Sequence, residues 1–522
     1  MDFQILDILV RYQERPVLRT FLRLIGRNSA GERVVADVYG VPFYLFSDVW
    51  EESWTRGINE RMLKSLQHFR SCKCVKCVGM KTGRQDPCKA VQKEMLETVI
   101  TEVESVEKKS FVGYAAKPRT FYKIHVSQAF LTRPVTWAAE SYLEDDDVHI
   151  NWFESDISPD IRFMTDFGIT PSAWCSVHGT VVEKSNIRSD HHFKIDLEKG
   201  GSITARPEII VNSPIKTLCW DIECICMEPG VERFPTSDKD PVITIGCIVS
   251  IYGKPEVTSK TVFQLGSCDA IEGEGTTVIS CRTEHQLLNE FSKFFARTGP
   301  DILSGYNSDM FDFVYVFERC EKLKIGAFKK ISIEPNFQVF FQKRVFQSMQ
   351  SGSIETILIH IPGTVCFDLL PLCRKSYKLR SYKLNNVAKH FLADQEKDDM
   401  PYNLLAPYMR KDSKHRALIA KYCLQDTALV QLLTDKLQLL TNQLAMSQVC
   451  GVSLNSIMTR GQSFKTKCLI LQETSKKGYI FPNFKRDATT GATMNVWMNK
   501  IVNAQAMEAG QNGTGFKGAT VS

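Results

Sequence analysis

The sequence lacks any long apolar run and any large excess of charge. No apolar stretch reaches the ~18 residues that a membrane-spanning helix requires. The net charge of +6 is small for 522 residues, so composition permits a nucleic-acid partner without indicating one. No secretory leader is recognisable, and the 17 cysteines are scattered, many of them in apolar runs. These features predict an intracellular protein with free buried thiols, not a disulfide-bonded secreted one.

The length predicts two to four domains, each large enough for its own core. Residues 1–50 contain short β-branched and aromatic runs separated by turns, which indicates a β-rich start. The charged residues 91–106 favour a helix. Strand and helix patterns then alternate over residues 215–430, which is typical of an α/β domain. Within it, Thr283 and Gln286 form a capping-box signature and Gly299 a stop, which predicts a helix between them.

A cysteine cluster lies early in the chain, at Cys72, Cys74, Cys77 and Cys88. Four thiolates are sufficient to hold a structural zinc ion. The spacing does not form two paired C-x-x-C knuckles, however, and this favours the alternative of a surface loop with incidental cysteines.

The central pattern is the apolar run at residues 218–224, which carries two acids at alternate positions. On a strand Asp221 and Glu223 project to one face, while Leu218, Trp220 and Ile222 fill the other. Two adjacent carboxylates in such a setting repel each other unless a cation neutralises them, and oxygen ligands suit Mg²⁺ or Mn²⁺. The alternative is a strand end with two solvated acids.

Two later stretches add acids of the same kind. Asp312 follows the turn after Gly305, at an expected helix start, where an N-cap role for it or for Asp309 is the simpler alternative. Tyr422 and Asp426 are spaced i, i+4 and share a helix face, where a surface ion pair is the alternative for the aspartate.

Taken together, a strand, a turn-to-helix junction and a late helix can converge at one end of a sheet. Four carboxylates can hold two divalent ions, which activate water and stabilise the leaving oxygen of a phosphodiester. Tyr422 is placed to orient that water.

The order D-I-E, Y-N-x-x-x-F-D and Y-x-x-x-D resembles the three exonuclease motifs of the family B DNA polymerases. The segments at residues 153–157, 234–235, 240–243, 378–385 and 456–462 are similar to delta-like members. The resemblance covers residues 100–485, with Trp220 in place of the commoner Phe and Thr364 in place of Arg. The Cys cluster and loops suggest a large DNA virus as the source.

The resemblance implies a ribonuclease H-like 3′–5′ proofreading exonuclease at residues 151–440, behind a β-rich domain at residues 1–150. Residues 441–485 would form a helical return towards the palm, and residues 486–522 a flexible insertion and the start of the palm. The polymerisation motifs D-x-x-S-L-Y-P-S and D-T-D-S do not occur in this sequence. Residues 339–361 would form the hairpin that separates primer from template.

The resemblance also implies a role for each site residue. Asp221, Glu223, Asp312 and Asp426 would bind two Mg²⁺ or Mn²⁺ ions, Tyr422 would position water, and Asn307 and Phe311 would hold the unpaired 3′ end. The expected partners are DNA and a processivity factor. The expected location is a nuclear or cytoplasmic replication site. The alternatives are a non-catalytic module that binds DNA or a partner subunit, and a stand-alone exoribonuclease.

Overall fold

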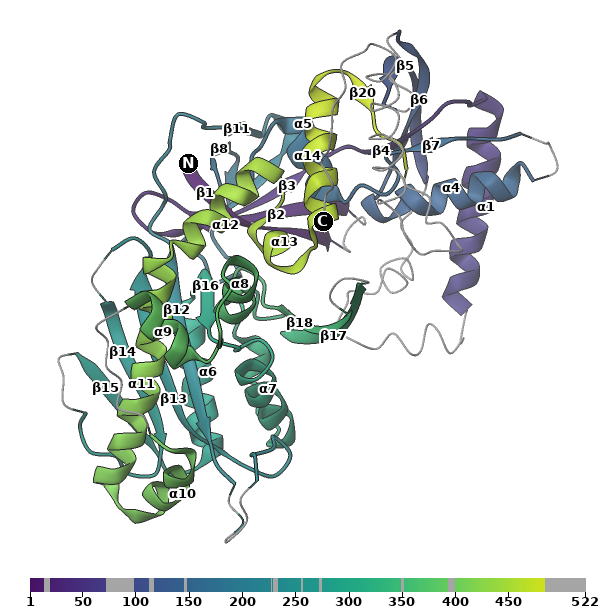
Figure 1. Cartoon of the computed structure of the whole chain (residues 1–522). Helices are drawn as coiled ribbons and strands as arrows, with labels where there is room; N and C mark the ends of the chain where they lie inside the picture. Colours follow the sequence, from purple (N-terminus) through teal and green to yellow (C-terminus); the bar gives the residue numbers. More distant parts are fainter. Residues whose placement is uncertain are drawn as a thin grey trace, which may run out of the picture. The chain divides into compact units, whose positions relative to one another are not determined.

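The computed structural model describes residues 1–13, 19–71, 98–111, 117–144, 148–226, 228, 233–254, 257–271, 275–348, 352–392 and 400–483. The chain forms two compact units (Figure 1). Of the described residues, those within Met1–Val41 and Pro159–Arg460 form the first unit, and those within Pro42–Ser71, Glu94–Ser158 and Gly461–Ser522 form the second. The cysteines of the predicted zinc site and residues 486–522 lie outside the described residues. The zinc site, the flexible insertion and the start of the palm therefore stay predictions.

A six-stranded mixed sheet forms the centre of the first unit, in the order β15-β14-β13-β12-β16-β19. β12 is antiparallel to β13 and parallel to β16, and β16 is parallel to β19. The strands are β12 (Lys216–Cys224), β13 (Val242–Ile251), β14 (Val257–Leu265), β15 (Thr276–Cys281), β16 (Ile302–Gly305) and β19 (Val365–Asp368).

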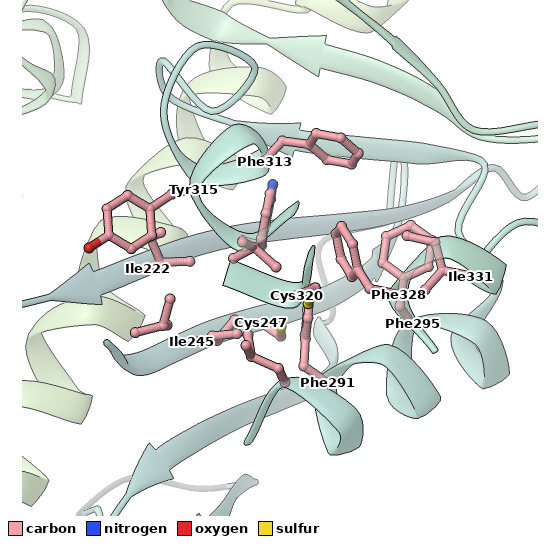
Figure 2. Close-up of a cluster of buried hydrophobic side chains, with 14 of the residues drawn as sticks. Ile222, Ile245, Cys247, Phe291, Phe295, Phe313, Tyr315, Cys320, Phe328 and Ile331 are labelled. Carbon is pink, nitrogen blue, oxygen red and sulfur yellow. The ribbon is translucent and has the colours of Figure 1, made fainter. Parts of the chain in front are cut away.

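Helices cover both faces of this sheet, and β12 contributes to both cores. Its even-numbered residues from Leu218 to Cys224 pack in one cluster with Phe291 and Phe313 of α6 (Glu284–Thr298) and α7 (Asp312–Lys322). Figure 2 shows part of this cluster, including Ile222. Cys219 packs instead in a second cluster with residues of α11 (Ser413–Lys436). The predicted alternation along β12 is therefore confirmed.

The same unit contains a seven-stranded sheet in the order β11-β8-β1-β2-β3-β10-β9. Its strands are β1 (Asp2–Gln13), β2 (Arg19–Arg27), β3 (Arg33–Tyr39), β8 (Trp174–His178), β9 (Thr180–Val181), β10 (His191–Asp196) and β11 (Ser202–Ala205). The predicted hairpin is also present, as the antiparallel pair β17 (Phe340–Ser348) and β18 (Gly352–His360). The other helices of this unit are α5 (Pro159–Phe167), η3 (Leu197–Lys199), η4 (Phe328–Lys330), α8 (Leu369–Ser376), α9 (Leu384–Leu392), α10 (Tyr402–Lys411), α12 (Leu439–Cys450) and α13 (Leu454–Thr459).

The second unit is built on a five-stranded sheet in the order β20-β5-β6-β4-β7. Its elements are β4 (Phe43–Ser47), α1 (Glu52–Ser71), β5 (Ile100–Ser110), β6 (Arg119–Val126), η2 (Ala129–Leu131), α4 (Thr132–Tyr142), β7 (Trp152–Phe153), α14 (Gln462–Lys476) and β20 (Tyr479–Ile480). Within the described part of the chain, no helix combines the length and apolarity needed to cross a membrane. The mixed α/β architecture with a β-rich start confirms the predicted fold class.

Local signals predicted some elements and missed others. Thr283 caps α6 by accepting from Gln286 N at 3.1 Å, and Gly299 ends it with a φ of 51°, as expected. The helix predicted at residues 91–106 is wrong where it is described, because β5 begins at Ile100 and pairs with β6. Tertiary strand pairing overrides the helix propensity of charged residues there.

A buried ion-pair cluster connects the two sheets of the first unit. Asp301, only 3% exposed, precedes β16 and pairs with Arg27 at the end of β2 and with Arg33 at the start of β3. It also accepts from Lys216 N at 2.8 Å. One carboxylate thus holds two guanidinium groups and the first residue of β12.

Asp301→Ala should destabilise the protein by about 3–5 kcal/mol, because it leaves two guanidinium charges buried without their partner. Glu290→Ala is the matched control, since its ion pair with Lys293 lies on the surface of α6 and its loss should cost less than about 1 kcal/mol. Chemical denaturation of both variants measures the difference. Equal losses would contradict the role assigned to Asp301.

Candidate active site

Asp221 and Glu223 lie on the face of β12 that is directed towards α11, and both are half-buried. The apolar residue between them, Ile222, is 5% exposed and packs on the opposite face. The two acids are therefore held by a strand whose other face is fixed in the core. This arrangement keeps them adjacent despite their mutual repulsion.

Helix α11 approaches the sheet closely because β13 carries a glycine at the crossing point. Gly246 is the register partner of Asp221. A Cβ atom at Gly246 would lie 2.9 Å from Thr427 Oγ1 and 3.0 Å from Cys423 Sγ. Only glycine leaves room for the helix at this distance, and the helix thereby places Cys423 beside the two acids.

The carboxylate oxygens of Asp221 and Glu223 and the sulfur of Cys423 all lie within 4.8 Å of one another. The Cys423 thiol donates to the Asp221 carbonyl oxygen at 3.4 Å and lies 3.7 Å from its Oδ2. Burial, and then the charges of Asp221, Glu223 and Asp426, raise the pKa of Cys423 well above its usual value. The thiol is therefore protonated at neutral pH, and the hard oxygen donors of this group suit a divalent cation such as Mg²⁺ or Mn²⁺.

Tyr422 and Asp426 lie one helical turn apart on α11, as the i, i+4 spacing predicts. Asp426 is 9% exposed, and Tyr422 is half-buried. Asp426 lies near enough to Cys423 for its charge to contribute to the raised pKa of that thiol.

Asp312 is the first residue of α7, and its side chain does not cap that helix. Its Oδ1 accepts from Ile222 N at 3.1 Å, so it binds the backbone of β12 midway between the two acids of that strand. Asp312 is 3% exposed, and burial raises its pKa from 3.8 to about 7. The N-cap alternative is therefore wrong for this residue.

The turn before α7 holds Asn307 and Phe311. Asn307 adopts a left-handed conformation with a φ of 60°, and its carbonyl accepts from Phe311 N at 3.1 Å. The centroid of the Phe311 ring lies 5.5 Å from that of Tyr315 and 5.6 Å from that of Phe234. Phe234 is 69% exposed, so a large aromatic face remains open to solvent beside Phe311.

The structure thus brings Asp221 and Glu223 together with Cys423 and places Asp312 on the Ile222 backbone between the two acids. The convergence of Asp426 with these acids stays a prediction. Sequence reasoning missed three residues that belong to this neighbourhood: Cys423, Phe234 and Asp368. An exposed Phe beside a Pro was a usable signal for Phe234. The positions of Cys423 and Asp368 depend on how α11 and β19 pack, which no local pattern encodes.

Residues 150–387 match the family model described as DNA polymerase family B, exonuclease domain. The chain is 33% identical over 412 residues to the DNA polymerase delta catalytic subunit of Drosophila melanogaster, covering 75% of this chain and 36% of that protein. It is 29% identical over 490 residues to the subunit of that name from Bos taurus, covering 92% of this chain and 42% of the relative. Both are cellular proteins, and the predicted viral origin stays a prediction.

A solved structure of the family B DNA polymerase from the archaeon Pyrobaculum calidifontis is similar with a TM-score of 0.62 and 21% identity. That likeness covers 93% of this chain and 52% of the archaeal one, and at this identity it supports the fold alone. The chain spans less than half the length of the delta subunits that it matches. Over residues 150–387 the chain is similar to the exonuclease domain of the family B DNA polymerases.

Proposed function

We propose that this chain is the amino-terminal part of a replicative family B DNA polymerase and carries its 3′–5′ proofreading exonuclease. The reaction is hydrolysis of the terminal phosphodiester of a single-stranded 3′ end. Water attacks the phosphorus, the bond to the 3′ oxygen of the preceding nucleotide breaks, that oxygen takes a proton, and a nucleoside monophosphate leaves. The observation that carries the proposal is the group formed by Asp221, Glu223 and Cys423 in a domain of this family.

Asp221, Glu223, Asp312 and Asp426 are the residues proposed to hold two Mg²⁺ or Mn²⁺ ions. Bound ions would supply the positive charge that activates water and stabilises the leaving oxygen. The protein contributes position: β12 fixes two carboxylates, and the Ile222 N–H fixes a third. Tyr422 orients the attacking water from the neighbouring helix.

The aromatic pair formed by Phe234 and Phe311 supports a single-stranded substrate. Base-on-aromatic stacking holds a strand without reading its sequence, as proofreading requires. Phe234 therefore joins Asn307 and Phe311 as a proposed contact to the 3′ end. The hairpin of β17 and β18 is the proposed strand separator.

We propose the following domains, partners and location from the resemblance to the family. Residues 1–150 form the amino-terminal domain, residues 151–440 the exonuclease domain, residues 441–485 the return segment and residues 486–522 the start of the palm region. DNA and a processivity factor are the proposed partners, at an intracellular replication site.

With Mg²⁺, the chain should shorten a 5′-labelled single-stranded DNA from its 3′ end. Asp221→Ala combined with Glu223→Ala should reduce the rate by at least ~10²-fold, the scale of losing one charge-stabilising group. Gel analysis of the products measures this, with Glu290→Ala as the control. Cleavage that persists in the double variant would refute the site. Binding of a primer–template without cleavage by the unaltered chain would favour the non-catalytic alternative, and preference for RNA the exoribonuclease.

Phe234→Ala should weaken binding of single-stranded DNA by about 5- to 150-fold, because stacking on an aromatic contributes about 1–3 kcal/mol per base. Phe234→Tyr keeps the ring and should restore binding. Val211→Ala removes another exposed apolar side chain and serves as the control, since Val211 is 67% exposed. Fluorescence anisotropy with a labelled oligonucleotide, in EDTA, measures all three. Equal affinity of the Phe234→Ala variant and the unaltered chain would exclude a stacking role.

The buried acids should make metal-free stability depend on pH. Asp312 has a folded pKa of about 7 against 3.8 for the free side chain, so between about pH 4 and 7 the folded state holds a proton that the unfolded state has released. The contribution of this group to stability is therefore lost as pH rises through that window. Asp312→Asn should gain stability relative to the unaltered chain from pH 5 to pH 7.5 in EDTA, and Mg²⁺ should narrow the difference. Thermal unfolding measures it, and a pH-independent difference would contradict the assignment.

A further inference from the structure

Asp368 lies where two parts of the exonuclease domain meet. It is the last residue of β19 and the register partner of Gly305, the last residue of β16. The chain leaves β16 there and enters the turn that contains Asn307. Asp368 is 3% exposed, so its carboxylate is enclosed beside the start of this turn.

The carboxylate of Asp368 accepts three backbone hydrogen bonds. Oδ1 accepts from Asn307 N at 2.8 Å and from Leu370 N at 3.0 Å, and Oδ2 accepts from Asp309 N at 3.3 Å. The bond from Leu370 caps α8. The bonds from Asn307 N and Asp309 N hold the turn, so one side chain binds two of its backbone N–H groups.

The turn needs such support because its backbone is unusual. Asn307 is in the left-handed region, which non-glycine residues rarely adopt. The turn folds back so tightly that a Cβ at Gly305 would lie 2.4 Å from the Cβ of Ser308. An acceptor that binds the N–H of Asn307 directly favours this conformation over the extended ones.

We propose that Asp368 is a positioning residue for the exonuclease reaction, which fixes the turn so that Asn307 and Phe311 meet the unpaired 3′ end. This inference rests on the proposed function. The Phe311 N–H donates to the Asn307 carbonyl, so a displacement of Asn307 displaces the ring that would stack on the terminal base. Among the described residues, the group of Asp221, Glu223 and Cys423 does not include Asp368.

Two other roles for Asp368 make different predictions. A simple helix cap needs only the bond from Leu370, yet two of the three bonds go to the turn. Loss of a metal ligand would instead raise the concentration of Mg²⁺ that cleavage requires. The positioning role therefore predicts a defect in substrate binding and leaves the requirement for Mg²⁺ unchanged.

The test is steady-state cleavage of a short single-stranded DNA by the full chain and its variants. Asp368→Ala removes both acceptor oxygens, and with them all three hydrogen bonds, and should raise KM on the order of 10²-fold, the scale of a misplaced binding group, with kcat changed much less. Asp368→Asn keeps one carbonyl acceptor for Asn307 and Leu370 but turns an amide towards the Asp309 N–H, so an intermediate KM is expected. The Mg²⁺ concentration that gives half-maximal cleavage should be the same in both variants as in the unaltered chain.

The control is Asp412→Asn, which alters the N-cap of α11, where Asp412 accepts from His415 N at 2.9 Å. A second readout is the fluorescence of a 2-aminopurine base at the 3′ end of the DNA, which stacking quenches. It is measured in EDTA, so that no cleavage occurs. Quenching should be weaker with both Asp368 variants and normal with the control. If Asp368→Ala does not fold, Asp368→Asn carries the test.

The outcomes separate this inference from the proposed function. An unaltered chain that does not cleave DNA refutes the proposed function and, with it, the role of Asp368. Cleavage by the unaltered chain together with unchanged KM and quenching in Asp368→Asn overturns the positioning role alone. A shift in half-saturating Mg²⁺ at constant KM also overturns it, in favour of action through the metals, and defects equal to those of Asp412→Asn reduce Asp368 to a helix cap.

Discussion

The alternation of side chains along β12 is the constraint on which the domain depends. The strand has a period of two, so burying Leu218, Trp220 and Ile222 on one face necessarily places Asp221 and Glu223 together on the other. A slip of one residue would move both acids into the hydrophobic cluster with Phe291, at a cost of several kcal/mol per charge. The hydrophobic core therefore fixes the positions of the acids more firmly than any contact that the acids make themselves.

The elements next to β12 place further groups beside Asp221 and Glu223. Gly246 lets α11 approach, and the helix brings a thiol that stays protonated, whose pKa Asp426 also raises. On the other side, Asp312 is fixed by the Ile222 N–H. The carboxylate oxygens gathered in this way are consistent with a site built to bind divalent cations.

Much of this site follows from the sequence, because its parts depend on local periodicity. The paired acids of β12, the i, i+4 spacing on α11 and the caps of α6 are encoded within a few residues, and the structure has them as expected. The strand at Ile100 could not be predicted in the same way, because pairing with β6 decides it. Asp368 also escapes local reasoning: it is 61 residues from Asn307 in sequence and reaches it only because β19 lies beside β16.

The acids and the proposed contacts to the substrate 3′ end are positioned by different parts of the structure. β12 and α11 are long elements, fixed by large apolar clusters, and a single substitution at their surface leaves the geometry intact. The turn at Asn307 packs against these clusters through the partly buried Tyr306 and Phe311, and its backbone conformation relies on a left-handed residue, a glycine and one buried carboxylate. Because the turn depends on so few groups, substrate placement can be altered without disturbing the acids, and specificity for an unpaired end is most easily tuned at this point.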